Sequence, residues 1–260
     1  MIDGGDRALQ ERIIRVALPA AQQYGFAIAG GHVLRLHGVI DRMSEDVDMF
    51  TNSVSTQEFA LARTAVIDAL QADDLTVEID ERRGPQFARL FVSDHERTTK
   101  LELGYDWRGS EATMLPVGPV LSREDSVATK ALALWGRTAA KDAIDVNAYL
   151  ASGEFTPDQI LDLAHEHDAG FLPTDFARSL RRVVALNDRD YAIYGADVHA
   201  TGEIRARLTA WASDIENTAT RAPAPSAAQR FAQIVEVESA PTAQQKPDDN
   251  QRRLGRPRQQ

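Results

Sequence analysis

Apolar residues recur with two different periods in the first 120 residues of the chain. Between residues 7 and 24 they return every three to four positions, which predicts an amphipathic helix. The segments 75–80, 86–93 and 98–104 alternate at every second position, with turn residues between them, and this predicts an antiparallel meander of three strands. The other elements expected here are strands at 26–30 and 46–50, a short helix that includes 33–36, and a helix that a capping box at Ser55 opens and that runs to about Gln71.

After Pro119 the pattern changes, and only helical spacing is found. Thr156 followed by Pro157 is typical of a helix N-cap with proline in the first turn. The sequence therefore predicts an α+β fold, with an α+β half over residues 1–120 followed by an all-helical half over 121–221. The other helices expected in the second half lie at about 122–135, 139–150, 173–187 and 203–219.

The last segment, residues 222–260, differs from the rest of the chain in composition. It holds five of the eleven prolines and seven glutamines, with few apolar residues. Such a segment buries too little apolar surface to offset the entropy lost on ordering, so we expect a disordered tail. The apolar stretch 231–237 is the exception, and it is expected either to dock as a strand or helix or to remain part of the tail.

Charge and cysteine content exclude several classes of protein. The formal net charge is −10, and the body up to residue 221 is still more acidic because the tail is slightly basic. Nucleic acid would therefore have to bind at a local patch and not by general electrostatics. The absence of cysteine excludes disulfides, thiolate zinc sites and a cysteine nucleophile. No apolar stretch approaches the ~20 residues needed to cross a bilayer, and no signal-peptide core is found, so we expect a cytoplasmic protein without a membrane partner.

Two carboxylates stand close together in the strand predicted at 46–50. Residues i and i+2 of a strand point to the same side, so Asp46 and Asp48 share one face while Val47 and Met49 pack on the other. Two adjacent carboxylates repel each other unless a cation or a proton lies between them. Oxygen ligands of this kind suit Mg²⁺, which takes one or two protein carboxylates together with substrate phosphates. The motif alone leaves open a solvated strand edge with two acids.

Two further features are placed to complete such a site. Gly30 and Gly31 stand where a strand gives way to a helix, a position where backbone N–H groups can approach a phosphate closely. Glu102 lies between apolar neighbours on a later strand, and it becomes a third carboxylate if that strand lies beside 46–50. The alternatives are a tight turn at the glycines and a solvent-facing Glu102.

Charged residues of the helical half offer a second group of candidates. Lys130 lies on a largely apolar predicted helix, so its ammonium group either extends to solvent or enters a charged site. Asp142 and Asp145, three residues apart, share a face of the next helix. Ordinary ion pairs, for example with Arg137 or Lys141, would also explain these two acids.

Other polar and aromatic residues are expected to have structural roles. His165 and His167 are two residues apart, a spacing that does not bring two imidazoles to one side of a helix, and we expect both at the surface. The tryptophans are expected in the core, and a group of arginines is expected to form either a solvated face or a patch that contacts phosphate. These residues are Trp107, Trp135 and Trp211, and Arg178, Arg181 and Arg182.

The order strand, Gly-Gly, helix, Asp-x-Asp strand and third acid resembles the polymerase-β-like nucleotidyltransferases. Three blocks are similar, more specifically, to the AbiEii/AbiGii family of nucleotidyltransferase toxins: GGHVLRLH at 30–37, RMSEDVDMF at 42–50 and KALALWGRTAAKDAID at 130–145. The resemblance spans roughly residues 25–150. Members typically have Thr after the glycines, where this chain has His32, which we expect to be a polar cap of the helix start.

The resemblance implies a polymerase-β-like core and a role for each block. The acids are expected to bind Mg²⁺, the glycines and the serine to lie at the triphosphate of an NTP, and the lysine to neutralise it. The residues so implied are Asp46, Asp48 and Glu102 for the metal; Gly30, Gly31, Ser44 and Lys130 for the nucleotide; and Asp46, Asp48, Lys130 and Asp145 for catalysis, the last either as a base or by ordering Lys130.

The function that the resemblance implies is that of the toxin of a toxin–antitoxin or phage-defence pair. Such a toxin would transfer nucleotides from an NTP to an RNA, with the 3′ end of tRNA as the expected acceptor, and would block translation. A cognate antitoxin protein would be its partner. Two alternatives stay open: an enzyme that modifies a small cationic acceptor such as an antibiotic, which the acidic body suggests, and a non-catalytic binding protein, which His32 suggests.

Overall fold

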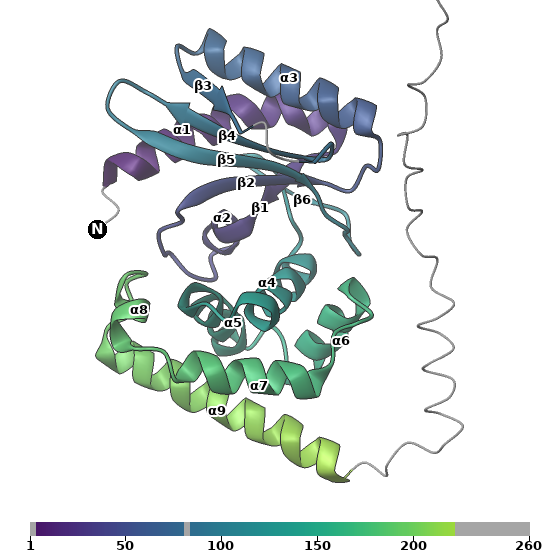
Figure 1. The fold of residues 1–260 in the computed structure, drawn as a ribbon, viewed down its shortest axis with the longest axis vertical. Coiled ribbons are helices and arrows are strands. Elements are labelled where there is room, and N and C mark those ends of the chain that lie inside the picture. The colour runs from purple at the N-terminus through teal and green to yellow at the C-terminus, as the bar shows by residue number, and fades with distance from the viewer. Residues whose placement is uncertain (1–3, 81–83, 222–260) are drawn as a thin grey trace, which may run out of the picture. The chain divides into compact units, whose positions relative to one another are not determined.

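The computed structural model describes residues 4–80 and 84–221 (Figure 1). The tail predicted over 222–260, including the stretch 231–237, lies outside these residues. The predicted α+β class is confirmed. In chain order, the first half contains α1 (Gly4–Ala21), the short 3₁₀ helix η1 (Gln22–Tyr24), β1 (Ala27–Ala29), α2 (Gly30–Leu36), β2 (Asp46–Thr51), α3 (Thr56–Ala72), β3 (Thr76–Ile79), β4 (Phe87–Ser93), β5 (Thr98–Tyr105), β6 (Thr113–Leu115) and β7 (Gly118–Val120).

Within the described part of the chain, seven strands form one mixed sheet in the order β3-β4-β5-β2-β1-β7-β6. β2 runs parallel to β5 and β1 runs parallel to β7, while the other neighbours are antiparallel. The predicted meander is confirmed, since β3, β4 and β5 are consecutive neighbours. The sequence did not predict β6 and β7, because they have three residues each and neither forms the continuous apolar run that identified the equally short β1.

The helices α1 and α3 cover one face of the sheet (Figure 1). Alternate residues of the central strands point into this layer, and Val47, Met49, Leu101 and Leu103 are fully buried there. A slip of one residue in register would turn these side chains outward and the acids inward, so burial fixes which face the acids occupy. Val47 and Met49 thus pack on the face opposite to the acids, as predicted.

The strand that carries Glu102, β5, lies directly beside β2, which was the condition for Glu102 to join the two aspartates. Asp48 is directly opposite Glu102, and Asp46 is opposite Lys100. Because the two strands are parallel and in this register, all four side chains lie on the open face of the sheet. Glu102 is therefore a neighbour of the Asp-x-Asp pair and not an isolated strand residue.

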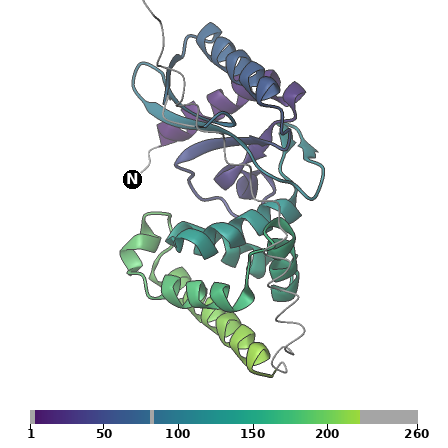
Figure 2. The same ribbon diagram turned by 45° about the vertical axis from the view of Figure 1, so that its right-hand side comes forward.

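The second half is helical (Figure 2), and its helices pack around an apolar cluster of their own. α2 belongs to both halves, because Val33 is buried in the N-terminal cluster and Leu34 in the helical one. The boundary predicted between residues 120 and 121 stays a prediction. In chain order, this half contains α4 (Arg123–Arg137), α5 (Ala140–Ser152), α6 (Pro157–His167), α7 (Pro173–Val184), α8 (Asp188–Ala192) and α9 (Val198–Arg221).

Details of the helix ends differ from the prediction. The helix expected to reach residue 187 ends at Val184, since Asn187 caps a new short helix, α8. Ser55 accepts a hydrogen bond from the backbone N–H of Glu58, but the Glu58 carboxylate accepts from the Ser53 hydroxyl, so only half of the predicted capping box forms. Across residues 4–80 and 84–221, no helix combines the length and apolar character that crossing a bilayer requires.

Candidate active site

The turn from β1 into α2 brings the backbone close to the acids of β2. Gly30 has φ +64°, a left-handed conformation that favours glycine, and a Cβ there would overlap the Asp48 carboxylate. A Cβ on Gly31 would lie 2.6 Å from the Ser44 Oγ. Both positions thus need glycine because the Asp48 and Ser44 side chains lie directly against the turn. A tight turn alone, the alternative left open by the sequence, would not require this at both positions.

Ser44 is held beside this turn by hydrogen bonds on two sides. Its hydroxyl donates to the Asp46 carbonyl at 3.0 Å, and its own carbonyl accepts from the Gln10 side chain at 2.9 Å. The serine is buried and borders the same cavity as Gly30 and Gly31. In this arrangement its hydroxyl orders the segment that leads into β2.

The three predicted carboxylates have different partners. Lys100 Nζ lies 2.6 Å from Asp46 Oδ1, and Arg89 Nε donates to Glu102 Oε1 at 2.8 Å. Asp48, among the described residues, has neither a hydrogen bond nor an ion pair for its carboxylate. Burial, opposed by Lys130 and reinforced by the charges of Glu102 and Asp46, raises the pKa of Asp48 to about 6. Asp48 is thus the acid whose charge is least compensated by the protein.

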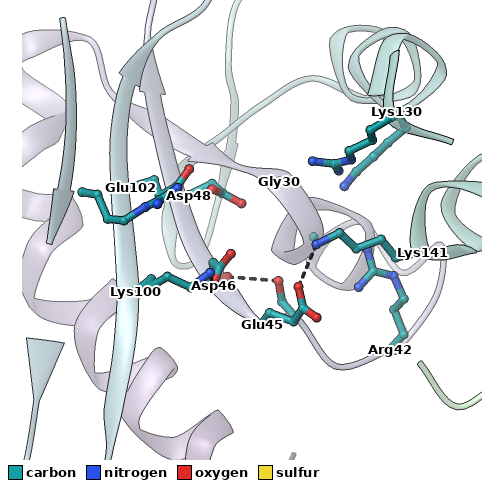
Figure 3. Close-up of a pocket in the computed structure, with 13 residues that line it drawn as sticks. Gly30, Arg42, Glu45, Asp46, Asp48, Lys100, Glu102, Lys130 and Lys141 are labelled. Atoms are coloured by element: carbon teal, nitrogen blue, oxygen red, sulfur yellow. Dashed lines mark hydrogen bonds and ion pairs between the residues drawn. The ribbon is translucent and has the colours of Figure 1, made fainter. Parts of the chain in front are cut away.

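These acids face a cavity of about 230 Å³ (Figure 3). Figure 3 shows the strand acids on one side and the cations of the helical half on the other, with Gly30 between them. The lining contains no apolar side chain and combines glycine and serine with acids and cations. The lining residues are Gly30, Gly31, Arg42, Ser44, Glu45, Asp46, Asp48, Arg89, Lys100, Glu102, Lys130, Arg137 and Lys141.

Lys130 reaches this charged cavity and does not extend to solvent. Its Nζ lies 2.9 Å from Asp145 Oδ2, and both side chains are buried. Arg42 donates to the two oxygens of the same carboxylate from Nε and Nη2, each at 2.5 Å. Burial alone would raise the pKa of Asp145, but the charge of Lys130 and the hydrogen bonds from Arg42 hold it below its usual range.

Asp145 is fully buried and does not line the cavity. Of the two roles expected for it, this position favours ordering Lys130 over acting as a base. Asp142 is also fully buried and accepts from Arg137 Nε and Nη2 at 2.6 and 2.7 Å, which is the ion pair left open as an alternative. Lys141 pairs instead with Glu45, at 2.7 Å.

The sequence missed most of the cations around the cavity. Arg89 and Lys100 lie on the open face of β4 and β5 beside Glu102, and the strand alternation that placed Glu102 could also have placed them. Arg42, Arg137 and Lys141 were part of the recognised blocks but were not expected to line the site; Arg137 and Lys141 were considered only as ion-pair partners of the acids at 142 and 145. Their convergence depends on how the helical half packs against the sheet, which no local pattern encodes.

His32 is not the polar cap that we expected. It is buried, it makes no hydrogen bond within the described part of the chain, and it does not line the 230 Å³ cavity. Burial, together with the positive charges of Arg35 and Arg42, lowers the pKa of His32 to about 4. The imidazole is therefore neutral near pH 7 and lies behind the site.

Two other expectations were wrong. His167 is not at the surface: its side chain is buried, with Nε2 2.9 Å from Asp125 Oδ1 and Nδ1 2.9 Å from the Leu163 carbonyl. Trp107 is not in the core, because 44% of it is exposed, whereas Trp211 is buried and Trp135 packs against the helical core.

The group of arginines on α7 makes contacts with neighbouring side chains. Arg181 donates to Glu216 and Ser213, Arg178 pairs with Asp175, and Arg182 donates to the Ser179 hydroxyl. These contacts agree with a solvated face, and the phosphate patch stays an untested alternative.

The chain matches, over residues 15–237, the model of a protein family described as nucleotidyl transferase AbiEii toxin of type IV toxin–antitoxin systems. The chain belongs to this family. The resemblance inferred from the three sequence blocks is confirmed, and the match extends well beyond them. Membership of the AbiEii family makes the chain a nucleotidyltransferase toxin of a type IV toxin–antitoxin system, and it implies an antitoxin as a partner.

Solved structures support the same fold for this AbiEii member. MenT4, a nucleotidyltransferase toxin from Mycobacterium tuberculosis, is similar with a TM-score of 0.57 and 18% identity, over 90% of this chain and 91% of that one. JHP933 from Helicobacter pylori is similar with a TM-score of 0.53 and 19% identity, over 89% and 97%. At this identity the likeness concerns the fold alone. Among curated proteins, no sequence matches the chain significantly.

Proposed function

We propose that this AbiEii-family chain is a Mg²⁺-dependent enzyme that transfers nucleotides from an NTP to RNA, with the 3′ end of tRNA as acceptor, and so blocks translation in the cytoplasm. The observation that supports this most is the single cavity shared by a glycine turn, the Asp-x-Asp strand and Lys130. These residues come from three separate segments, and Lys130 is far from the other two in the sequence. The cavity of about 230 Å³ that all three segments line supports a site where a polyanionic substrate binds and its phosphate group reacts.

The triphosphate is assigned to the side of the cavity formed by Gly30, Gly31 and Lys130. The two glycines line the cavity, and the absence of a Cβ lets the Asp48 carboxylate and the Ser44 hydroxyl lie directly against this turn at the start of α2. Lys130 supplies a compact positive charge, and the buried Asp145, itself bound by Arg42, holds it in place before substrate binds. We assign Asp145 as a positioning residue, since it acts through Lys130 and not on the substrate.

The donor set fits a magnesium ion, although within the described residues no three acids or histidines are already grouped as a ligand set. Asp46 and Asp48 share a face, Glu102 is opposite Asp48, and the Asp48 carboxylate has no protein partner among the described residues. These three residues would hold the ion, with phosphate oxygens completing its shell. A bound divalent ion supplies activation of the attacking hydroxyl and neutralises charge on the leaving pyrophosphate. Lys100 and Arg89 neutralise Asp46 and Glu102 when no ion is bound.

The lining of the cavity contains six lysines and arginines and four acids. The buried Asp142 and Asp145 behind it pair with Arg137, Arg42 and Lys130, so the charge of the site does not separate an anionic acceptor from a cationic one. The choice of RNA over a small cationic acceptor rests on membership of the AbiEii family of toxins, and the transfer assay separates the two. The argument for a non-catalytic protein rested on His32, and that residue does not line the cavity.

A direct transfer assay tests the proposed function. Purified protein is incubated with Mg²⁺, each labelled NTP in turn, and either total tRNA or a cationic aminoglycoside. Label on RNA that depends on Mg²⁺ and on Asp46 supports the proposal. Label on the aminoglycoside would replace it with the small-molecule alternative, and NTP binding without transfer would replace it with the non-catalytic one.

A further inference from the structure

A second cavity, of about 380 Å³, borders the first and differs from it in character. Gly30, Asp48, Glu102, Lys130 and Arg137 line both, so the two are adjacent. Apolar side chains are absent from the first cavity but form much of the wall of the second. The apolar residues of this wall are Ala29, Phe50, Trp107, Leu121, Leu132 and Ala133.

A charged cavity joined to a partly apolar one fits a ligand with the same two ends. A nucleotide has a polyanionic triphosphate at one end and a flat, largely apolar base at the other. If the phosphates lie beside Gly30 and Lys130 in the first cavity, the second cavity is the adjoining space. The base of the NTP, or the base of the nucleotide that carries the attacking hydroxyl, can reach it. Ligand sites commonly combine an apolar wall with a few polar groups in this way.

Trp107 is the side chain of this wall best suited to contact a base. It is 44% exposed, in contrast to the buried Trp211, and it lies on the loop between β5 and β6. Its ring lies 4.8 Å from the His167 ring, at an interplanar angle of 88°. An indole that is partly exposed at a cavity offers a π face on which a base can stack.

The loop that carries Trp107 is fixed by the helical half. The backbone N–H groups of Gly109 and Ser110 donate to the Asp125 carboxylate at 2.7 and 3.1 Å. Asp125 in turn pairs with His167, whose ring contacts the indole. The indole is thereby held in place from two directions, so a base that stacks on it does not bear the entropy of ordering the side chain.

We propose that the 380 Å³ cavity is a nucleobase subsite and that Trp107 stacks on the base of a substrate. The inference deepens the proposed function and rests on it for the position of the phosphates. The base belongs either to the NTP or to the terminal nucleotide of the acceptor, and the two sources share this chemistry. Trp107 then sets how tightly a nucleotide binds, while Lys130 and the glycines bind its phosphates.

Binding measurements on the full chain with Mg²⁺, and without the co-substrate, separate these contributions. The probes are the four NTPs, inorganic tripolyphosphate, a single-stranded RNA tetranucleotide, and the same tetranucleotide with an abasic 3′ end. Stacking on an aromatic side chain corresponds to about tenfold in affinity or more. We therefore expect Trp107→Ala to weaken the NTPs or the tetranucleotide about tenfold and to leave tripolyphosphate and the abasic RNA unchanged.

Matched variants give the controls. Trp107→Phe keeps an aromatic face and is expected to retain most of the affinity. Tyr105→Ala removes another exposed aromatic residue, which is 41% exposed and lines neither cavity, and should change nothing. If Trp107→Ala lowers the melting temperature, tryptophan fluorescence tests the contact independently of that variant. The NTP or the tetranucleotide should quench the emission of the wild-type chain and should not quench that of Trp107→Phe.

The outcomes separate the inference from the proposed function. Weakening of the NTPs alone assigns the base to the NTP, and weakening of the tetranucleotide alone assigns it to the acceptor. Equal affinity of Trp107→Ala and wild type for both ligands, an equal loss for tripolyphosphate, or no quenching in the wild type would overturn the inference, even in a chain that transfers nucleotides. A wild-type chain that binds NTP without transfer would overturn only the proposed function.

Discussion

Removing Asp145 is expected to destabilise the protein more than removing Lys130, although the lysine lines the cavity and the aspartate does not. Asp145 compensates two buried cations at once, Arg42 and Lys130. Asp145→Ala leaves both without a counter-charge, and breaking a buried ion pair from one side typically costs about 3–5 kcal/mol. Lys130→Ala leaves Asp145 bound by Nε and Nη2 of Arg42, so only one charged hydrogen bond is lost, which corresponds to about 2 kcal/mol.

Urea unfolding at pH 7 and 25 °C measures both values. Total stabilities of domains lie at about 5–15 kcal/mol, so Asp145→Ala is expected to remain folded but close to its limit, and Asp145→Asn provides a milder variant. Lys141→Ala is the matched control: it removes another cation of the cavity, paired with a partly exposed Glu45, and should change stability by less than about 1 kcal/mol.

Transfer activity is expected to follow a different order from stability. Folded Lys130→Ala should lose on the order of 10²-fold in rate, because a positioned charge at the triphosphate is gone. Lys130→Arg should recover only part of this, since a planar guanidinium replaces a compact ammonium. The reasoning is refuted if Lys130→Ala is less stable than Asp145→Ala, or if it transfers nucleotides at the wild-type rate.

Three further predictions concern other parts of the site. Gly30→Ala should abolish transfer and lower the melting temperature, because the φ of +64° is unfavourable for alanine and the added Cβ would overlap Asp48. Gly136→Ala, where an added Cβ meets no other atom, is the control. A Gly30→Ala variant that still transfers nucleotides would contradict the prediction. Asp48→Asn should abolish Mg²⁺-dependent transfer without lowering stability, as it relieves repulsion from Glu102; unfolding of this variant would remove the metal assignment. His167 has a raised pKa because, although burial alone would lower it, hydrogen bonds to Asp125 and Leu163 favour the imidazolium. The imidazolium therefore contributes its full stabilisation below the unfolded pKa of about 6.5, and this stabilisation is lost as the pH rises through the pKa of the folded state. The difference in unfolding free energy between wild type and His167→Gln should shrink from pH 6 to pH 9. A difference that stays constant would speak against the charged pair with Asp125.

Local patterns in the sequence were sufficient for the strand that carries the acids. Alternation along 46–50 predicted that Asp46 and Asp48 share a face, and a meander ending in 98–104 allowed Glu102 to be considered beside them. These predictions hold because burial on one face fixes the register of a strand. The turn at Gly30 could also be predicted, because its left-handed conformation and its contact with Asp48 require a glycine, and a glycine is visible in the sequence.

Contacts between distant segments could not be predicted in this way. The spacing of His165 and His167 correctly separates the two rings, but only the tertiary packing decides that His167 turns inward to Asp125. Trp107 was assigned to the core from its apolar character, whereas its loop is held at the surface by backbone hydrogen bonds to that same aspartate. Side-chain type alone does not reveal either arrangement.

During synthesis the chain emerges N-terminus first, so the acids of the cavity are made before the cations of the helical half that face them. Leu34 of α2 also lacks its buried apolar neighbours until the segment from Val127 onward has been added. A nascent chain that ends before Lys130 therefore carries Asp46 and Asp48 without the ammonium group and its buried counter-ion. For a member of a toxin family, this means that fragments from interrupted translation lack the charge that we propose binds phosphate, and that the ribosome has completed both Lys130 and Asp145 before the proposed active site can form.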